Sequence, residues 1–220
     1  MNISAAQQEF IKFCLANNVL AFGDFTLKSG LKSHYFFNAG LFNTNKAISL
    51  LGQYYARLIH DEVIKKNNLQ FDGLFGPAYK GITLAATASI ALYNNYQYET
   101  DVAFNRKEVK THGEGGNIIG ADVRNKNLLL IDDVISAGTA TRDSINLLKH
   151  YNANIVGMVI AMDRKMPMDM GDGKKLTAAQ VLQQEFNIPI FSIISIDDVI
   201  EFTRGEVEYQ HLTKLLVKAD

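Results

Sequence analysis

Two adjacent carboxylates, Asp132 and Asp133, directly follow the apolar residues 128–131. An unbroken apolar run is typical of a central strand that is buried on both faces, and open α/β sheets bind ligands at the carboxyl ends of such strands. Two carboxylates placed there are costly to bury unless cations or hydroxyl donors meet them. The pair therefore indicates a site that accepts hydrogen bonds from sugar hydroxyls or contacts a metal ion.

The next residues, 134–140, form a predicted turn of small side chains that leads into a helix over about 138–150. Small residues let backbone N–H groups approach an anion closely, and a helix N-terminus adds partial positive charge. Ser136 and Thr139 add hydroxyl donors, so the region suits a ribose that carries a 5-phosphate. The alternative for Asp133 or Ser136 taken singly is an ordinary helix cap; the complete run favours a ligand site.

Several other site classes lack their motifs. Residues 76–83 do not complete a Walker A loop, because they end in Gly-Ile-Thr where Gly-Lys-Ser/Thr is needed. No Gly-x-Gly-x-x-Gly follows a predicted strand, so a dinucleotide fingerprint is absent. The five histidines lack metal-ligand spacing, and the single cysteine, Cys14, cannot close an intrachain disulfide. We find no support for a catalytic serine or cysteine triad.

Composition narrows the class of protein further. The 220 residues carry 22 Lys and Arg against 23 Asp and Glu, which disfavours a globally basic nucleic-acid binder. The first ten residues lack the basic start and apolar core of a signal peptide. The uncharged stretch 81–98 contains Thr, Ser, Asn and Gln and predicts a buried helix, not a membrane span. We expect one cytoplasmic domain over residues 1–220 without nucleic-acid or membrane partners.

Strands and helices alternate along most of the chain, which predicts an α/β fold with a parallel sheet between two layers of helices. The predicted strands are residues 71–75, 101–104, 127–131, 155–162 and 190–194, and the helices are 81–93, 138–150 and 177–186.

The N-terminal part stands outside this alternation. An amphipathic pattern predicts a helix over residues 4–17, and two β-type runs between Phe22 and Phe37 flank Ser29-Gly30 as a hairpin. Thr44 is a plausible N-cap for a further helix. We expect residues 1–42 to contribute a helix and a hairpin as a small hood over the sheet edge.

Residues 105–120 are predicted to form a long polar loop that holds several cations and ends in a glycine-rich run. A connection of this length indicates either function or disorder. Glycines permit large backbone changes, and the cations suit a negatively charged leaving group. By composition alone the segment fits an ordinary exposed loop, because Glu108 and Glu114 partly offset the bases.

Residues 131–139, Ile-Asp-Asp-Val-Ile-Ser-Ala-Gly-Thr, resemble the phosphoribosyl-diphosphate (PRPP) signature of type I phosphoribosyltransferases. Further segments resemble the members of that family that use orotate as the base, and the likeness covers about residues 20–165 in order. These segments are residues 25–30, 35–40, 75–81, and 104–108 with 112–116.

The resemblance implies a central, mostly parallel sheet flanked by helices, with a small N-terminal hood. It implies Mg²⁺-dependent transfer of 5-phosphoribosyl from PRPP to orotate, giving orotidine 5'-monophosphate and diphosphate in de novo pyrimidine (UMP) biosynthesis. Mg²⁺ would be held mainly through PRPP, with Asp132 and Asp133 nearby. Similar enzymes are homodimers, in which the loop over 105–120 would act as a mobile lid that completes the partner's site.

The resemblance also assigns roles to single residues. The implied catalytic residues are Lys80, Lys110, Asp132 and Asp133. The implied PRPP-binding residues are Lys28, Tyr79, Lys80, Arg106, Lys107, Lys110, His112, Asp132, Asp133, Val134, Ile135, Ser136, Ala137, Gly138, Thr139 and Ala140. The implied orotate-binding residues are Lys28, Phe36, Phe37, Ser136 and Arg164.

Chemistry agrees with some of these roles, and plainer interpretations stay open for others. A planar guanidinium such as that of Arg164 matches the orotate carboxylate in bidentate fashion, although this arginine also fits an exposed loop start. Lys80 alone also fits a solvated helix start. Phe36 and Phe37 are adjacent in an extended run, so they face opposite ways and at least one should be core.

The chain departs from the family pattern at three positions. Ser136 stands where the family usually has Thr and keeps the hydroxyl, whereas Leu31 and His34 stand where Arg and Pro are common. Two other functions remain open. A purine-specific phosphoribosyltransferase leaves Lys28 and Arg164 unexplained, and a non-catalytic PRPP-binding regulator has no need of the lid cations.

Overall fold

The structure is a computed structural model, which describes residues 3–26, 32–110, 116–169, 175–206 and 209–210, without the side chains of 108–110 and 169. The chain divides into two compact units, one formed by residues 1–47 with 194–220 and the other by residues 48–193. Within the described residues, no helix is both long enough and apolar enough to cross a membrane. The prediction of a single domain with a hood over residues 1–42 stays a prediction.

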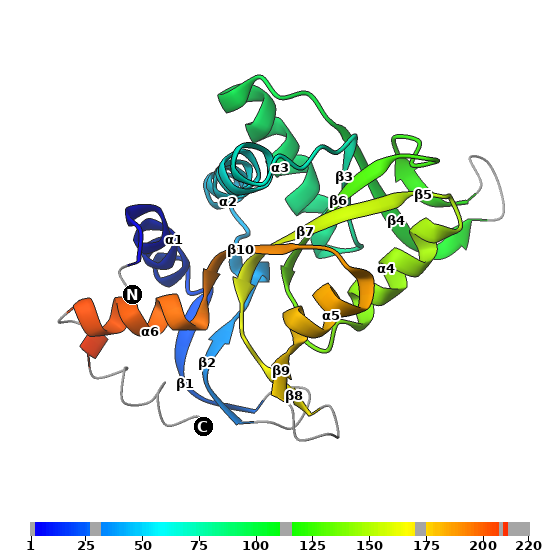
Figure 1. The fold of residues 1–220 in the computed structure, drawn as a ribbon. Coiled ribbons are helices and arrows are strands. Elements are labelled where there is room, and N and C mark those ends of the chain that lie inside the picture. Colours follow the sequence, from blue (N-terminus) through cyan, green and yellow to red (C-terminus); the bar gives the residue numbers. More distant parts are fainter. Residues whose placement is uncertain (1–2, 27–31, 111–115, 170–174, 207–208, 211–220) are drawn as a thin grey trace. The chain divides into compact units, whose positions relative to one another are not determined.

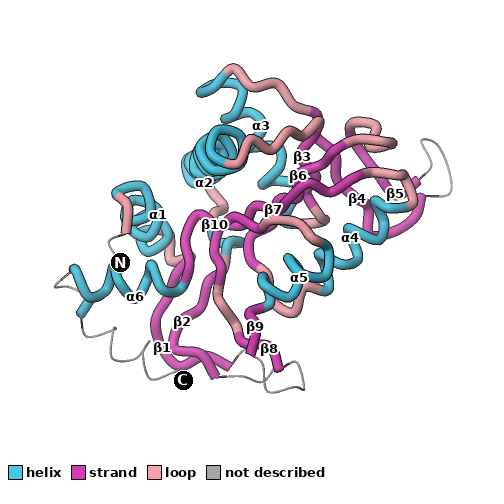
Figure 2. Tube along the Cα trace, in the orientation of Figure 1, coloured by secondary structure: helices cyan, strands magenta, loops and turns pink. Residues whose placement is uncertain are grey.

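Helices and strands alternate through the larger unit, as the sequence predicts (Figure 2). The helices are α1 (Ala5–Ala16), α2 (Asn45–Leu58), α3 (Lys80–Tyr96), α4 (Thr139–Lys149), α5 (Ala178–Phe186) and α6 (Ile196–Gly205), with a short 3₁₀ helix at Ala39–Leu41 and a π-helical continuation of α2 at Ile59–Lys66. The strands are β1 (Leu20–Thr26), β2 (Lys32–Phe37), β3 (Gly73–Gly76), β4 (Asp101–Lys110), β5 (Gly116–Gly120), β6 (Asn127–Val134), β7 (Asn154–Asp163), β8 (Pro167–Asp169), β9 (Lys175–Thr177) and β10 (Ile190–Ser195).

A six-stranded sheet in the order β10-β7-β6-β3-β4-β5 forms the centre of the larger unit (Figure 1). Strands β7, β6, β3 and β4 pair in parallel, and β5 pairs antiparallel with β4. Helices α2 and α3 lie on one face of the sheet, and α4 and α5 lie on the other. The predicted α/β fold with a mostly parallel central sheet is therefore confirmed.

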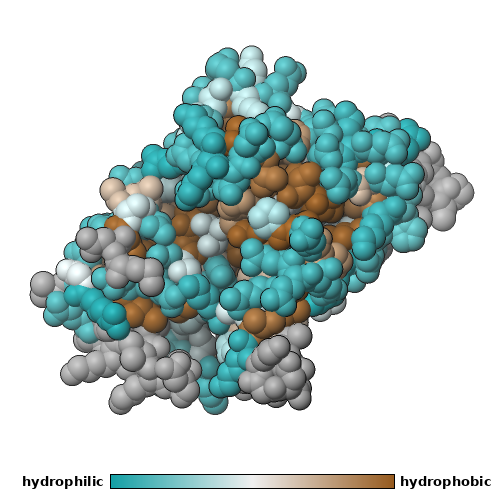
Figure 3. Space-filling model, in the orientation of Figure 1, coloured by the Kyte–Doolittle hydropathy of each residue, from teal (hydrophilic) through white to brown (hydrophobic). Residues whose placement is uncertain are grey.

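Strand β6 lies between β7 and β3 in the sheet, and its apolar side chains are buried on both faces of the sheet. Residues 128–131 are at most 2% exposed. Leu130 and Ile160 share one apolar cluster with Leu148 of α4 and Leu182 of α5. Hydrophilic residues cover most of the face seen in Figure 3, as expected of helices whose apolar sides pack on a sheet.

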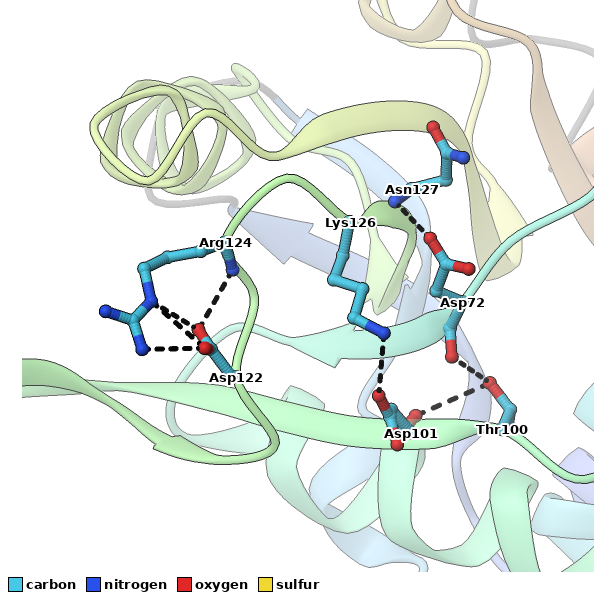
Figure 4. A network of polar contacts seen from close by, with 7 residues as sticks. All are labelled: Asp72, Thr100, Asp101, Asp122, Arg124, Lys126 and Asn127. Carbon is cyan, nitrogen blue, oxygen red and sulfur yellow. Dashed lines mark hydrogen bonds and ion pairs between the residues drawn. The ribbon is translucent and has the colours of Figure 1, made fainter.

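The amino ends of three strands are joined by polar contacts at the edge shown in Figure 4. Asp72, just before β3, accepts the Asn127 N–H of β6 at 2.7 Å, and its backbone carbonyl accepts the Thr100 hydroxyl at 3.2 Å. Nearby, Arg124 forms an exposed side-on pair with Asp122, with Nη2 at 2.7 Å from Oδ2. These contacts fix the strands at the end opposite the carboxylate pair.

The smaller unit confirms the predicted N-terminal helix and hairpin. Ser4 begins α1 with a reciprocal capping box to Gln7. Strands β1 and β2 pair antiparallel from Leu20–Phe37 to Thr26–Lys32, and their connection lies outside the described residues. Helix α6, which the sequence interpretation did not include, also belongs to this unit.

The prediction of a long loop over residues 105–120 is wrong. Strand β4 continues through Lys110, and β5 pairs with it from Ala103–Gly120 to Lys110–Gly116, with an irregularity between Asn105 and Lys110. The many polar and charged residues of this segment favour a loop when only the sequence is considered. They are tolerated on a strand here because β4 lies near the sheet edge. Only residues 111–115 of the predicted loop lie outside the description.

Candidate active site

The carboxylate pair lies beside a lysine from the neighbouring strand connection. Asp133 is 5% exposed, and its Oδ2 accepts a hydrogen bond from Lys80 Nζ at 2.5 Å. Lys80 begins α3, four residues after β3 ends at Gly76, and β3 pairs in parallel with β6. Parallel pairing brings the two strand ends to one edge, so residues 53 positions apart meet there.

Asp132 is held from two sides. Its Oδ1 accepts the Asp133 N–H at 2.9 Å, and its backbone carbonyl accepts the hydroxyl of Tyr55 at 2.7 Å. Tyr55 is fully buried on α2. Burial raises the pKa of the Asp132 carboxyl from 3.8 to about 7, the Asp133 charge adds to the rise, and Lys80 opposes it.

This pKa shift predicts a pH-dependent stability. The unfolded carboxyl ionises near 3.8 and the folded one near 7, so between these values only the folded state keeps the proton. The free energy of unfolding should therefore fall as pH rises through this window, by at most about 1.4 kcal/mol per pH unit from this group. Denaturant unfolding of the wild type and of Asp132→Asn across pH 4–8 measures the difference.

Asp122→Asn is the matched control. Hydrogen bonds from Arg124 lower the pKa of Asp122 to about 2, so its contribution to stability is present above about 4 and is lost only in stronger acid. The control should keep the decline between pH 4 and 7, and Asp132→Asn should flatten it. Equal slopes in wild type and Asp132→Asn would contradict the assigned pKa.

The turn after the carboxylates leads into α4 without a side-chain cap. Gly138 is the N-cap residue at φ +77°, and no side chain among the described residues bonds to the helix N-terminus there. The interpretation of Asp133 or Ser136 as the cap of this helix is therefore wrong. Ser136 and Thr139 are exposed beside the free N-terminus, which leaves backbone N–H groups and two hydroxyls to bind an anion.

A second turn, over residues 77–80, lies at the end of β3. A Cβ on Gly76 would come within 2.0 Å of the Gly81 backbone oxygen, so the turn closes only with glycine there. The Ala78 N–H bonds to Asn105 Oδ1 of β4 at 2.8 Å, and a cis peptide bond joins Ala78 to Tyr79. The turn thus places Tyr79 directly before Lys80, the residue that bonds to Asp133.

Strand β4 carries the predicted lid cations. Lys107 Nζ lies 4.9 Å from the centre of the Tyr79 ring, whose residue is 67% exposed. Arg106 is partly buried on the same strand. Lys110 ends β4, but its side chain lies outside the described residues, as does all of His112. The structure therefore brings Lys107 to the turn over residues 77–80 and does not place the side chains of Lys110 and His112.

The predicted base-binding residues are divided between the two units. Phe36 is 38% exposed and Phe37 is 5% exposed, so the prediction that one of them is core is confirmed. Ser136 and Arg164 belong to the larger unit, where Arg164 directly follows β7. Lys28 lies outside the described residues. The joint binding of orotate by this set stays a prediction.

The donor set fits a metal that is held mostly by its substrate. Within the described part of the chain, no group of three or more His, Cys, Asp and Glu side chains could hold a metal ion. Asp132 and Asp133 supply hard oxygen atoms of the kind that Mg²⁺ prefers, but too few to enclose it. An Mg²⁺ ion at this pair would need further oxygen ligands from outside it.

Three residues that position the site were not identified from the sequence: Tyr55, Asn105 and Arg142. Arg142 donates from Nη1 to the Ala137 carbonyl at 2.8 Å and pairs with Glu185. Each reaches its partner through side-chain geometry that periodicity does not encode. Asn105 had one usable signal, since it stands directly before the paired cations Arg106 and Lys107.

Comparison with known proteins agrees with this geometry. Residues 44–188 match the family model of the phosphoribosyl transferase domain, so the chain belongs to that family. Curated relatives include the orotate phosphoribosyltransferases of Mannheimia succiniciproducens (47% identical; 92% of this chain, 90% of the relative) and Haemophilus influenzae strain PittGG (46%; 95% and 94%). These relatives place the chain among the orotate phosphoribosyltransferases, the pentosyltransferase class EC 2.4.2.10.

Solved structures support the same conclusion. A crystal structure of the orotate phosphoribosyltransferase from Francisella tularensis superimposes with a TM-score of 0.81 at 41% identity, covering 96% of each chain. A Mycobacterium tuberculosis orotate phosphoribosyltransferase in complex with PRPP has a TM-score of 0.62 at 17% identity, covering 88% of this chain and 98% of that one. The second likeness shows a shared fold.

Proposed function

We propose that this chain transfers the 5-phosphoribosyl group of PRPP to a ring nitrogen of orotate in an Mg²⁺-dependent reaction, releasing diphosphate and forming orotidine 5'-monophosphate. This reaction would serve pyrimidine biosynthesis in the cytoplasm. The observation that carries the proposal is the Asp133–Lys80 pair, which lies directly before the uncapped turn into α4. Acceptors for sugar hydroxyls and donors for a phosphate therefore lie a few residues apart on one strand end.

The mechanism needs no protein nucleophile. The bond from the sugar carbon to diphosphate breaks with its electron pair on oxygen, the bond to the base nitrogen forms, and the proton of that nitrogen is released to diphosphate or to solvent. Asp132 and Asp133 would orient the ribose hydroxyls, and the turn Val134–Ala140 would hold the 5-phosphate. Lys80, whose side chain is 53% exposed, is free to turn from Asp133 toward the departing diphosphate. Mg²⁺, when bound near Asp132 and Asp133, would supply further positive charge to stabilise the leaving group.

The strand β4 would bring the remaining cations to the leaving group. Lys107 already lies over Tyr79 at the diphosphate-facing turn. Closure of the segment that contains Lys110 and His112 would exclude water, which could otherwise hydrolyse the activated sugar.

We also propose a homodimer in which this segment completes the neighbouring site. Large side chains exposed on α3 support it: Ile90 is 60% exposed and Tyr93 is 55% exposed, one helical turn apart. Aromatic side chains such as that of Tyr93 are enriched at the centres of protein interfaces. Sedimentation equilibrium should give twice the chain mass of 24.5 kDa, and a monomer at assay concentrations would contradict the shared site.

A steady-state assay with orotate, PRPP and Mg²⁺ tests the proposed reaction. Loss of orotate absorbance should match diphosphate release one to one, and adenine or hypoxanthine in place of orotate should give no product. Product with a purine base would instead favour the purine-specific alternative. PRPP binding without diphosphate release would favour a non-catalytic regulator, and equal rates with excess chelator would contradict the metal requirement.

A further inference from the structure

The phosphate-facing turn is supported from behind by an arginine that has no assigned part in binding. Arg142 lies on the first turn of α4, and its Nη1 donates to the backbone carbonyl of Ala137 at 2.8 Å. The Nε–Nη2 edge of the guanidinium pairs with the carboxylate of Glu185 on α5. Arg142 Nε lies 2.8 Å and Nη2 lies 2.7 Å from Glu185 Oε2. One side chain therefore joins the turn to a helix 43 residues away.

This contact fixes the direction of the peptide that begins α4. The peptide bond from Ala137 to Gly138 is trans, since the cis bond among the described residues is the one from Ala78 to Tyr79. In a trans peptide the carbonyl and the following N–H point in opposite directions. When Arg142 holds the Ala137 carbonyl, the Gly138 N–H must point away from the guanidinium. That N–H belongs to the N-terminal end of the helix, where the first N–H groups have no partner within the helix.

The space behind the turn is filled tightly. A Cβ on Gly138 would lie 3.0 Å from Arg142 Nη1 and 3.0 Å from Leu182 Cδ1, and Gly138 has φ +77°. A side chain at position 138 would therefore press against both Arg142 and Leu182, and the turn packs closely on the arginine only with glycine there. Glu185 limits the arginine in turn, because a side-on pair restrains both the position and the plane of the guanidinium.

We propose that Arg142, oriented by Glu185, is a positioning residue that presets the turn Val134–Ala140 for the 5-phosphate of the sugar substrate. The proposal rests on the proposed function, because it takes that turn to be the phosphate site. Arg142 makes no contact with the phosphate itself. It acts through the Ala137–Gly138 peptide, so its loss should weaken phosphate binding and leave the chemical step almost unchanged.

The test measures ribose 5-phosphate binding by calorimetry, together with the kinetics of the full reaction. We expect Arg142→Met to raise both the Kd for ribose 5-phosphate and the KM for PRPP by about tenfold. The kcat at saturating PRPP and the KM for orotate should stay within about twofold. Arg142→Lys should lie between wild type and Arg142→Met, because one ammonium cannot hold the carbonyl and the carboxylate in the same fork geometry.

Arg124→Met is the matched control. Arg124 makes the same kind of side-on pair, with Asp122, at the opposite edge of the sheet (Figure 4), and it should change neither Kd nor KM. If Arg142→Met does not fold, Glu185→Gln replaces it, with an expected rise of a few-fold in the same two constants.

These outcomes distinguish a failure of the positioning role of Arg142 from a failure of the phosphate site itself. Wild-type affinity for ribose 5-phosphate in a folded Arg142 variant overturns the positioning role, as does a loss confined to thermal stability and kcat. An equal effect of Arg124→Met also overturns it. Failure of the wild-type protein to bind ribose 5-phosphate overturns the phosphate assignment of the turn, and the positioning role with it.

Discussion

Asp133→Asn should lower kcat/KM for PRPP by at least about 100-fold while the protein remains folded. Asp133 is the less exposed member of the carboxylate pair and accepts the bond from Lys80. The amide keeps the shape but removes the charge that holds Lys80 and accepts hydrogen bonds from the sugar. Stability should not fall in proportion, since the half-exposed Lys80 can return to water. Thermal unfolding and steady-state kinetics on one preparation measure both effects.

A second readout distinguishes this electrostatic role from a packing defect. The Asp133 charge is one cause of the raised pKa of Asp132, so Asp133→Asn should lower that pKa toward its ordinary range. Carbon-detected NMR titration of the carboxyl follows the change. Asp122→Asn, at an exposed arginine pair, is the control and should leave activity unchanged. Activity of Asp133→Asn within a few-fold of wild type would contradict the assigned role.

Lys110→Ala should lower kcat by about 100-fold or more, and change the free energy of unfolding by no more than about 0.5 kcal/mol. The resemblance assigns Lys110 to the lid, and β4 ends at this residue. A cation that meets the diphosphate only after closure stabilises the leaving group and not the fold. Lys65→Ala, at an exposed lysine of the helical segment Ile59–Lys66, is the control. Unchanged turnover in Lys110→Ala would contradict the role.

Mixing the two inactive variants tests whether the lid acts across a dimer. If Asp133 serves its own site and Lys110 serves the partner's, each mixed dimer has one intact site and one doubly altered site. Random exchange of subunits should then restore about a quarter of wild-type activity. No recovery after exchange would place both residues in the same subunit's site, or would exclude the dimer.

The strand-helix alternation and the carboxylate turn were predictable because local patterns encode them. Residues 128–131 are uniformly apolar, and the two acids after them mark the end of the buried strand. Ser4 and Thr177 begin α1 and α5 with reciprocal capping boxes, which depend on a side chain three residues away. Information of this kind is local, so it can be read directly from the chain.

The missed features depend on tertiary context. Polar residues in β4 form a strand only because β3 offers a parallel partner and Gly116–Gly120 offers an antiparallel one. The bond from Tyr55 to Asp132 spans 77 positions, and Arg142 reaches Glu185 over 43. No periodicity relates such pairs. These contacts form only in the folded chain, where the sheet brings the strand ends together.

A crystal structure of the protein with PRPP and Mg²⁺ is the most direct test of whether the carboxylate edge binds the phosphorylated sugar. The sugar hydroxyls should lie within hydrogen-bond distance of Asp132 and Asp133, and the 5-phosphate should lie against the N–H groups of Val134–Ala140. Lys80 should then contact diphosphate instead of Asp133. A fully occupied ligand bound elsewhere, or a carboxylate edge left empty at saturating PRPP, would contradict the central claim that this edge grips a phosphorylated pentose.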